Sequence, residues 1–270
     1  MRYDIGEGFT TIDRDVESLL EGLPTTPVDI CRVAQGLVVP MHLAEGFGIP
    51  ADRFEERSIR PASDILRVLA THDNRGIDNE RSFANRVVGT CRHFSLLACA
   101  FLRYRGISAR CRAGFASYFT PGSFLDHWVV EYHDAVAKRW VRVDPEILGF
   151  DFVTAPHDLA EGEFLTGGEA WVTCRRGLAD PMSFGVDGFS DNFGIGEIRG
   201  NLIRDLAALN NVETLPWDEW GRMAASYAGE TGPDFDELMD EAAATCASDD
   251  KQAITALYDR HDFAVPPTFL

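Results

Sequence analysis

The chain has 270 residues, 45% of them hydrophobic and 25% charged, which is the composition of an ordinary globular protein. Its 43 acidic against 25 basic residues give a formal net charge of -18. This excess repels phosphate backbones and anionic lipid, so we expect no nucleic acid and no membrane surface among its partners. The plainest interpretation of the charge is a solvated acidic surface, and beyond it neutral or cationic substrates are favoured.

Residues 1–20 place acidic side chains where a secretory signal needs a basic patch and an apolar stretch. No apolar run in the chain reaches the ~18 residues that a membrane span needs. We therefore expect a cytoplasmic protein. Its cysteines are scattered without a disulfide framework, and a reducing compartment predicts that most of them are buried free thiols. They are Cys31, Cys91, Cys99, Cys111, Cys174 and Cys246.

Short helices separated by proline and glycine are predicted for the first part of the chain. Apolar residues recur at helical spacing in residues 13–20 and 27–38, and Pro61 starts a third such segment that runs to residue 72. Residues 74–80 are polar and contain a glycine, which favours a loop.

The middle of the chain predicts one helix followed by a small sheet. Residues 90–105 fit a helix that Gly106 ends in a left-handed conformation. Alternating apolar residues then predict strands at about 107–118, 126–132 and 139–144. After an irregular stretch the helical spacing returns, at 167–178, 196–210, 217–228, 233–246 and 251–259.

This order of elements predicts an α+β fold in a single domain spanning residues 1–270. The core of this domain is expected at about residues 80–150, where the candidate catalytic residues discussed below lie, with helical N- and C-terminal extensions at 1–75 and 155–270. A chain of this length lies near the upper limit for one hydrophobic core.

The segment VGTCRHFSLLACAFLRYRG contains the strongest chemical signal. Thr90 is a good N-cap, which puts Cys91 at the first helical position. A helix N-terminus stabilises a thiolate, the reactive form of cysteine, and Arg92 and His93 are expected to add positive potential. The backbone N–H groups there can also receive an oxyanion when the thiolate attacks a carbonyl carbon. The alternative is a structural thiol, as we expect for Cys99, two helical turns further among apolar neighbours.

The segment DHWVVEYHDAVAKRWVRVDP predicts a β-hairpin that brings a base and an acid together. With the turn centred between Ala135 and Val136, the apolar residues of both strands share one face, and His127 falls directly opposite Asp144 on the other. Directly opposed side chains have Cβ atoms about 5 Å apart, so a hydrogen bond between them would fix the imidazole tautomer.

A slip of one residue in this pairing would bury Glu131 or Arg142, which disfavours the alternative register. Taken separately, His127 is also compatible with an ordinary strand histidine, and Asp144 with the start of a strand-ending Asp-Pro turn. Together with a capped cysteine upstream, the pair is better explained as a triad of Cys91, His127 and Asp144.

Three ordered blocks in this region resemble the transglutaminase-like superfamily of papain-like cysteine enzymes. The family pattern is a cysteine opening a helix that ends in G-[IV]-x-[AS]-R, then a His-Trp strand, then a strand ending in Trp-x-x-x-Asp. Here the blocks are GTCRHFSLLACAFLRYRGISAR, DHWVVEY and RWVRVDP, within roughly residues 85–150. The resemblance implies that Cys91 is the nucleophile, His127 the base and Asp144 the orienting acid. It also implies a core in which the helix bearing the nucleophile packs on a small antiparallel sheet.

The resemblance indicates thiol chemistry better than a substrate, because the superfamily includes protein cross-linkers, deamidases, peptidases, amidases and inactive members. We expect an acyl-transfer enzyme that acts on a peptide-like or small amide or ester substrate through a thioester, by hydrolysis or by transfer to an amine. The alternative is a catalytically silent binding module of the same fold. Calcium regulation is not carried over, because this sequence has none of the additional β-domains of the calcium-dependent animal enzymes. The oligomeric state stays open.

Three further residues are candidates for contacts with the substrate or the oxyanion. An oxyanion hole needs a second donor besides the nucleophile's own N–H, and Asn85, six residues before Cys91, is a candidate. The alternative for Asn85 is a solvated loop residue. Arg92 is the second candidate. Trp217, in LPWDEW, is the third, and core packing is its alternative.

No metal and no cofactor are predicted. Cys91 and His93 form a C-x-H pair, but the paired spacing of a structural zinc site is missing. The sequence contains no GxGxxG, P-loop or GxSxG segment to support dinucleotide, nucleoside triphosphate or serine-hydrolase chemistry. In the tail, residues 201–209 predict an amphipathic helix whose Arg204 and Asp205 are solvent-facing or structural.

Overall fold

The computed structural model describes residues 6–189, 192–260 and 262–270. Helices and a largely antiparallel sheet make the fold α+β, as predicted. The chain divides into two compact units. The first unit contains the chain up to Cys111 together with Val129–Leu159, and the second contains Arg112–Trp128 and Ala160–Leu270. The single domain stays a prediction.

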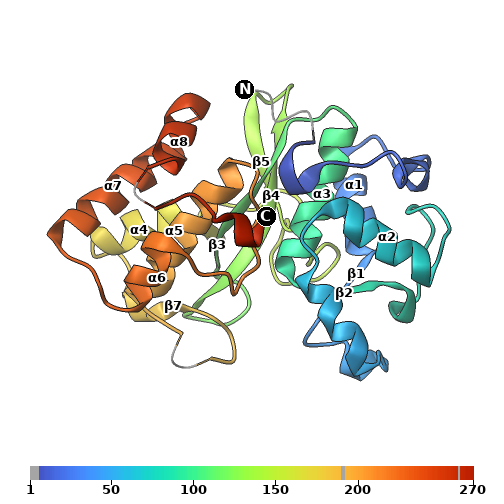
Figure 1. The fold of residues 1–270 in the computed structure, drawn as a ribbon, viewed down its shortest axis with the longest axis horizontal. Coiled ribbons are helices and arrows are strands. Elements are labelled where there is room, and N and C mark those ends of the chain that lie inside the picture. The colour runs from blue at the N-terminus through green and yellow to red at the C-terminus, as the bar shows by residue number, and fades with distance from the viewer. Residues whose placement is uncertain (1–5, 190–191, 261) are drawn as a thin grey trace. The chain divides into compact units, whose positions relative to one another are not determined.

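Helices dominate the first unit (Figure 1). Its elements before the sheet are η1 (Gly8–Thr10), η2 (Glu17–Leu20), α1 (Pro27–Gln35), β1 (Val38–Pro40), η3 (Glu45–Phe47), η4 (Ala51–Ser58), α2 (Ala62–His72), η5 (Phe83–Asn85), β2 (Val87–Gly89) and α3 (Cys91–Tyr104). The predicted helices at 27–38, 61–72 and 90–105 are confirmed. The helix predicted at 13–20 is wrong: only the 3₁₀ turn η2 forms there, and its N-cap Val16 has no side chain that could accept a hydrogen bond from a first helical turn.

The strands β1 and β2 form a parallel pair that the sequence did not predict. Each has only three residues, and Val38, Val39, Val87 and Val88 are all fully buried. Strands buried on both faces lack the alternation of apolar and polar residues by which a strand is recognised. This pair matters for the site because β2 leads directly to α3.

The larger sheet has the strand order β5-β4-β3-β6, and β7 pairs with β4 (Figure 1). Its strands are β3 (Ala109–Ala116), β4 (Phe124–Asp134), β5 (Arg139–Val143), β6 (Phe164–Thr166) and β7 (Phe184–Gly185). The three strands predicted at 107–118, 126–132 and 139–144 are therefore confirmed. The pairs β3–β6 and β4–β5 are antiparallel, whereas β7 runs parallel to β4.

The register of the β4–β5 hairpin differs by two residues from the expected one. Val130 pairs with Val143, so the centre of the turn lies one residue further along the chain than expected. The turn is held by the Asp134 carboxylate, which accepts hydrogen bonds from the backbone N–H groups of Val136 (2.8 Å) and Ala137 (3.0 Å). A shift of two residues leaves every side chain on its expected face, because the pleat has a period of two.

Because Val130 pairs with Val143, continuing the register by one residue would place Val129, and not His127, opposite Asp144. The prediction that His127 lies directly opposite Asp144 is therefore wrong, since His127 is two residues earlier on β4. Asp144 itself has left the ladder, because its N–H donates to the carbonyl of Pro156 (2.9 Å).

Glu131 is buried, at 3% exposure, although its burial was expected to be unfavourable. Its carboxylate accepts hydrogen bonds from Arg110 on β3 (2.7 Å) and from Arg142 on β5 (3.0 Å). Arg142 is also its direct cross-strand partner. Two guanidinium groups thus compensate the desolvation of one carboxylate, which is the condition under which a buried charge is tolerated.

The second unit is a helical bundle on the other strands. Its elements besides the sheet are α4 (Gly167–Arg175), η6 (Pro181–Ser183), α5 (Ile195–Leu209), α6 (Gly221–Tyr227), α7 (Pro233–Ala247), α8 (Lys251–Tyr258) and η7 (Pro267–Phe269). The helices predicted for the tail are confirmed, with α6 starting later than expected. A continuous cluster of buried apolar side chains from β3 and these helices forms the core of this unit.

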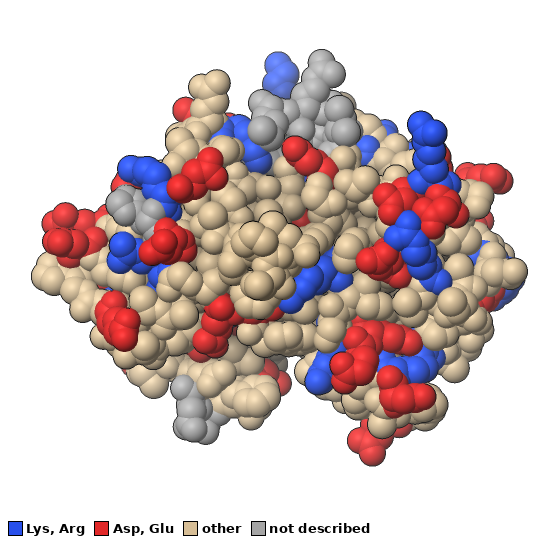
Figure 2. Space-filling view, viewed as in Figure 1, with Lys and Arg blue, Asp and Glu red and all other residues tan. Residues whose placement is uncertain are grey.

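Charged side chains of both signs lie on the surface, and Figure 2 shows acidic ones gathered in several clusters with basic ones between them. All six cysteines are present as thiols rather than as disulfides. Within the described part of the chain, no helix has both the length and the apolar character needed to cross a membrane.

The two glycines that open α4 allow close packing of helices. A Cβ atom on Gly167 would overlap with the backbone of Asn201 and Leu202 on α5. A Cβ atom on Gly168 would instead make an ordinary contact, at 3.4 Å, with the backbone of Ala243 on α7. Only Gly167 is therefore required by the packing.

We predict that Gly167→Ala lowers the free energy of unfolding by about 3 kcal/mol, because backbone atoms of α5 cannot move aside as a side chain can. Gly168→Ala is the matched control, one residue further on the same helix, and should change stability by less than about 1 kcal/mol. Urea unfolding of both variants measures the difference. Equal stabilities would contradict the packing described for α4 and α5.

Candidate active site

Cys91 is the first residue of α3 in the first unit, as predicted. The chain leaves β2 through Thr90, whose extended backbone (φ -118°, ψ 176°) makes it the N-cap. The helix ends after Tyr104, and Gly106 follows in the left-handed conformation (φ 75°) that was expected of it. The Cys91 side chain is half-buried. The thiol thus lies at a helix N-terminus, where the helix dipole favours a thiolate.

The helix that begins with Cys91 is buried on all sides rather than along one stripe. Every residue from Arg92 to Arg103 is buried. Cys99 lies in this interior at 0% exposure, which confirms its structural role, and the Cys111 thiol contacts the Ser95 carbonyl (3.4 Å). A helix held by a surrounding core offers a rigid position for a reactive group at its end.

The two residues after Cys91 do not both add positive potential. Arg92 is fully buried, and its guanidinium donates to the carbonyl of Ile59 (3.2 Å). Burial and the charge of Arg92 lower the pKa of His93 to about 3, against the opposing effect of the Ile59 carbonyl. The His93 ring is therefore neutral near neutral pH, and the expected contribution of His93 to the potential is wrong.

Asp144 is fully buried in the same unit as Cys91. Its Oδ1 atom accepts a hydrogen bond from the N–H of Glu146 (2.9 Å), which closes a turn at the Asp-Pro step after β5. Burial first, and then electrostatic interactions with Cys99 and Asp144, raise the pKa of the Cys31 thiol. Asp144 is thus both a turn residue and a buried acid.

His127 belongs to the second unit, where it lies on β4 at 3% exposure. The rings of Phe119 and Tyr118 meet it edge to face, with centroids at 5.0 and 6.3 Å. These aromatic neighbours keep water from much of the imidazole. His127 is therefore a buried, ring-packed histidine and not a solvated one.

A polar network that the sequence analysis missed lies beside His127 in the second unit. The carboxylate of Asp126, the preceding residue, accepts a hydrogen bond from the Asn201 side chain (2.7 Å). Burial raises the pKa of Asp126, although Arg204 and Asn201 act in the opposite direction. Nearby on α5 and α6, the Tyr227 hydroxyl donates to Glu197 (3.0 Å), and burial raises the pKa of both groups, that of Tyr227 to about 12.

The charged residues of α5 are structural rather than solvent-facing. Arg204 is 3% and Asp205 0% exposed. Asp205 forms a two-pronged ion pair with Arg112 on β3, with bonds of 2.8 and 2.7 Å. A signal was present in the sequence: an Arg-Asp pair interrupts the apolar run of NLIRDLAAL, and charges at such positions need partners from elsewhere in the fold.

The remaining candidates lie in different surroundings. Asn85 is half-buried at the end of η5 in the first unit. Trp217, in the second unit, is 45% exposed, whereas the Trp220 ring is buried and donates to the carbonyl of Phe263 (2.8 Å). Contacts of Asn85, Arg92 and Trp217 with a substrate stay predictions. Among the described residues, no group of three or more His, Cys, Asp or Glu side chains is arranged to hold a metal ion.

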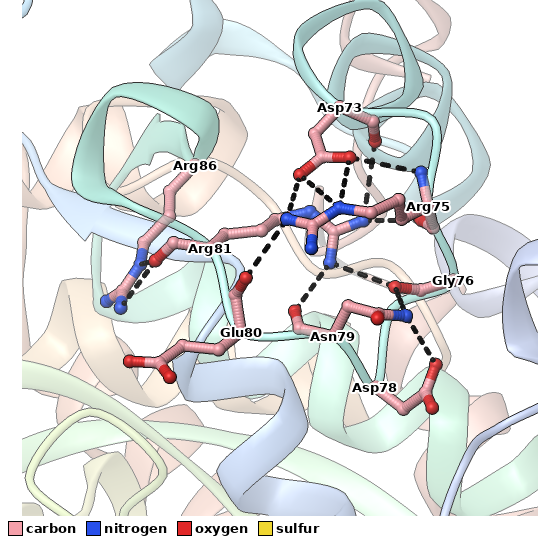
Figure 3. A network of polar contacts seen from close by, with 8 residues as sticks. All are labelled: Asp73, Arg75, Gly76, Asp78, Asn79, Glu80, Arg81 and Arg86. Atoms are coloured by element: carbon pink, nitrogen blue, oxygen red, sulfur yellow. Dashed lines mark hydrogen bonds and ion pairs between the residues drawn. The ribbon is translucent and has the colours of Figure 1, made fainter.

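The loop that precedes Asn85 is organised around Arg81, which is 2% exposed (Figure 3). This loop was predicted for residues 74–80 and is confirmed. The Arg81 guanidinium donates to four backbone carbonyls, those of Asp73, Arg75, Gly76 and Asn79. The buried guanidinium thus satisfies four carbonyl oxygens of a loop that has no secondary structure of its own.

Residues 60–145 match the family model of the transglutaminase-like superfamily, which comprises cysteine-dependent enzymes. The matched segment is about a third of the chain, and it includes Cys91, His127 and Asp144. The chain also aligns with a crystal structure of a candidate cysteine protease from Cytophaga hutchinsonii, at 18% identity and a TM-score of 0.20. The alignment covers 50% of this chain and 43% of that one, and it is too distant to bear on fold or function. No curated protein shows a significant match.

The raised pKa of Asp126 predicts the pH dependence of one variant. Asp126 has a higher pKa in the folded than in the unfolded chain. The stability that its protonated form contributes to the folded protein is therefore lost as pH rises through the folded pKa. Asp126→Asn mimics the protonated form, so it should match the wild type in acid and become the more stable protein as pH rises to neutral. Unfolding by urea at a series of pH values measures the difference.

Asp158 supplies the control of opposite sign. Hydrogen bonds from Arg139 lower the pKa of Asp158, so its ionised form contributes stability that is lost in acid. Asp158→Asn should therefore be the less stable protein at neutral pH and match the wild type in acid. A pH-independent difference for Asp126→Asn would contradict the burial of that carboxyl.

Proposed function

We propose that the chain is a cysteine-dependent acyl-transfer enzyme in which Cys91 is the nucleophile, His127 the general base and Asp144 the acid that orients the imidazole. The observation that supports it most is the position of Cys91 at the capped N-terminus of a buried helix, inside a segment that matches the transglutaminase-like superfamily. His127 and Asp144 are polar residues of the same segment and are both buried, as groups with a chemical role commonly are.

The proposed reaction has two steps. The Cys91 sulfur, its proton passed to His127, attacks the carbonyl carbon of an amide or ester and forms a tetrahedral oxyanion. N–H groups at the start of α3 stabilise that oxyanion, with Asn85 as the proposed second donor. The bond to the leaving amine or alcohol then breaks, His127 returns the proton to the leaving group, and the acyl group remains on Cys91 as a thioester.

In the second step water or an amine attacks the thioester carbonyl. His127 takes the proton of the attacking group, the C–S bond breaks, and Cys91 leaves as the thiolate. Hydrolysis of a peptide-like or small amide is the first proposal, and transfer to an amine is the second. The acidic surface favours a neutral or cationic substrate over an anionic one. The cytoplasm stays the predicted compartment.

Alkylation tests the nucleophile without knowledge of the substrate. At about pH 6, iodoacetamide should modify Cys91 at least ~100-fold faster than Cys174, as measured by mass spectrometry of peptides. Cys174 is the internal control, because it is also half-buried and burial raises its pKa to about 11, which leaves almost no thiolate. Equal rates for the two cysteines would contradict a nucleophilic Cys91.

Acylation by p-nitrophenyl acetate tests the other two roles. We predict an acetyl thioester on Cys91, formed roughly 10³–10⁴-fold more slowly in His127→Asn and in Asp144→Asn, because the base is lost or its tautomer is no longer fixed. Asp158→Asn, a surface carboxylate substitution, should acylate at the wild-type rate. Wild-type rates in both triad variants would refute these assignments and favour the silent binding module.

A further inference from the structure

The first turn of α3 is closed by two reciprocal hydrogen bonds. The N–H of His93 donates to the carbonyl of Thr90 (2.8 Å), and the N–H of Thr90 donates to the ring atom Nδ1 of His93 (3.1 Å). The Thr90 hydroxyl also lies 3.2 Å from the same ring nitrogen. Cys91 and Arg92 are thus enclosed in a small ring of bonds, which fixes the backbone on both sides of the cysteine.

Packing fixes the His93 ring as well as its hydrogen bonds do. The side chain is fully buried, and a Cβ atom on Gly89 would come within 2.9 Å of its Cβ and Cγ atoms. Glycine at the end of β2 therefore makes the space that the ring occupies. Arg92 is held in the same region by its bond to the Ile59 carbonyl. The ring cannot turn away from Thr90 without a cavity or a clash.

The hydrogen bond from Thr90 also defines the chemical state of the ring. Nδ1 accepts an N–H bond only when it carries no proton, so the neutral ring must have its proton on Nε2. Burial beside the Arg92 charge opposes a second proton. The His93 ring therefore stays neutral, and its Nδ1 stays a hydrogen-bond acceptor, over the pH range in which a thiolate at Cys91 would form.

We propose that His93 is a positioning residue for Cys91: its neutral ring closes the first turn of α3 and holds the Cα–Cβ bond of Cys91 in one direction. The proposal rests on the proposed role of Cys91 as the nucleophile. In the common capping box a Glu or Gln occupies this third position. A carboxylate there would add a negative charge beside the thiolate and weaken the stabilisation by the helix N-terminus, whereas the imidazole closes the turn without charge.

The tautomer of His93 tests the proposal independently of any activity. In ¹⁵N NMR spectra of the full chain, His93 should be the neutral tautomer protonated on Nε2, unchanged between about pH 5 and pH 8. A proton on Nδ1, or titration of this ring near its ordinary pKa of about 6.5, would overturn the proposal. This result does not depend on whether Cys91 is a nucleophile.

Two variants test the consequence for Cys91. Gln at position 93 can accept the Thr90 N–H bond, so His93→Gln should keep the alkylation rate of Cys91 within about threefold of the wild type. Leu cannot accept it, so His93→Leu should slow Cys91 about tenfold while the rate of Cys174 stays the same. A Cys91 alkylation rate that is retained in His93→Gln but lost in His93→Leu would show that the hydrogen bond from Thr90 matters, and not only the volume of the side chain.

The outcomes distinguish the two proposals. A Cys91 that is no faster than Cys174 in the wild type refutes the proposed function, whereas a fast Cys91 with equal rates in both variants refutes the positioning role alone. If His93→Leu does not fold, His93→Gln decides, because a tenfold slowing of Cys91 there with unchanged Cys174 overturns the proposal.

Discussion

The buried carboxylate of Glu131 is the constraint on which the geometry of the first unit depends. It accepts hydrogen bonds from Arg110 and Arg142, on the two strands that flank β4. A buried carboxylate that loses its partners costs several kcal/mol, so a register that separates Glu131 from these guanidinium groups is excluded. The same register determines where β5 ends, and therefore where Asp144 starts its turn.

Buried guanidinium groups organise this acidic protein in several other places. Arg81 binds the carbonyls of its own loop, Arg103 donates to Ala109, and Arg112 pairs with Asp205. A guanidinium offers five N–H donors in one plane, so it can satisfy carbonyl oxygens of irregular backbone that no strand or helix reaches. Although the chain carries a negative net charge, several of its arginines are buried and bind carbonyl or carboxylate oxygens in the interior.

Most of the elements could be predicted from the sequence, because their signals are local. The N-cap Thr90 and the left-handed Gly106 define the helix of Cys91, and both lie in adjacent sequence. The paired strands β1 and β2 were missed, since three buried residues carry no periodicity. The network around Asp126 was missed because its partner Asn201 comes from far along the chain.

The sequence by itself determined the α+β order of elements, the position of Cys91 at a helix N-terminus and the face of each residue in the β4–β5 hairpin. Only the tertiary structure decided the register of the hairpin, the partners of the buried charges and the neutrality of His93. The physical reason is the same in each case. Alternation along a strand repeats every two residues, so a slip of two is invisible to it. The pKa of the His93 ring depends first on its burial in the fold, which its neighbours in sequence do not reveal.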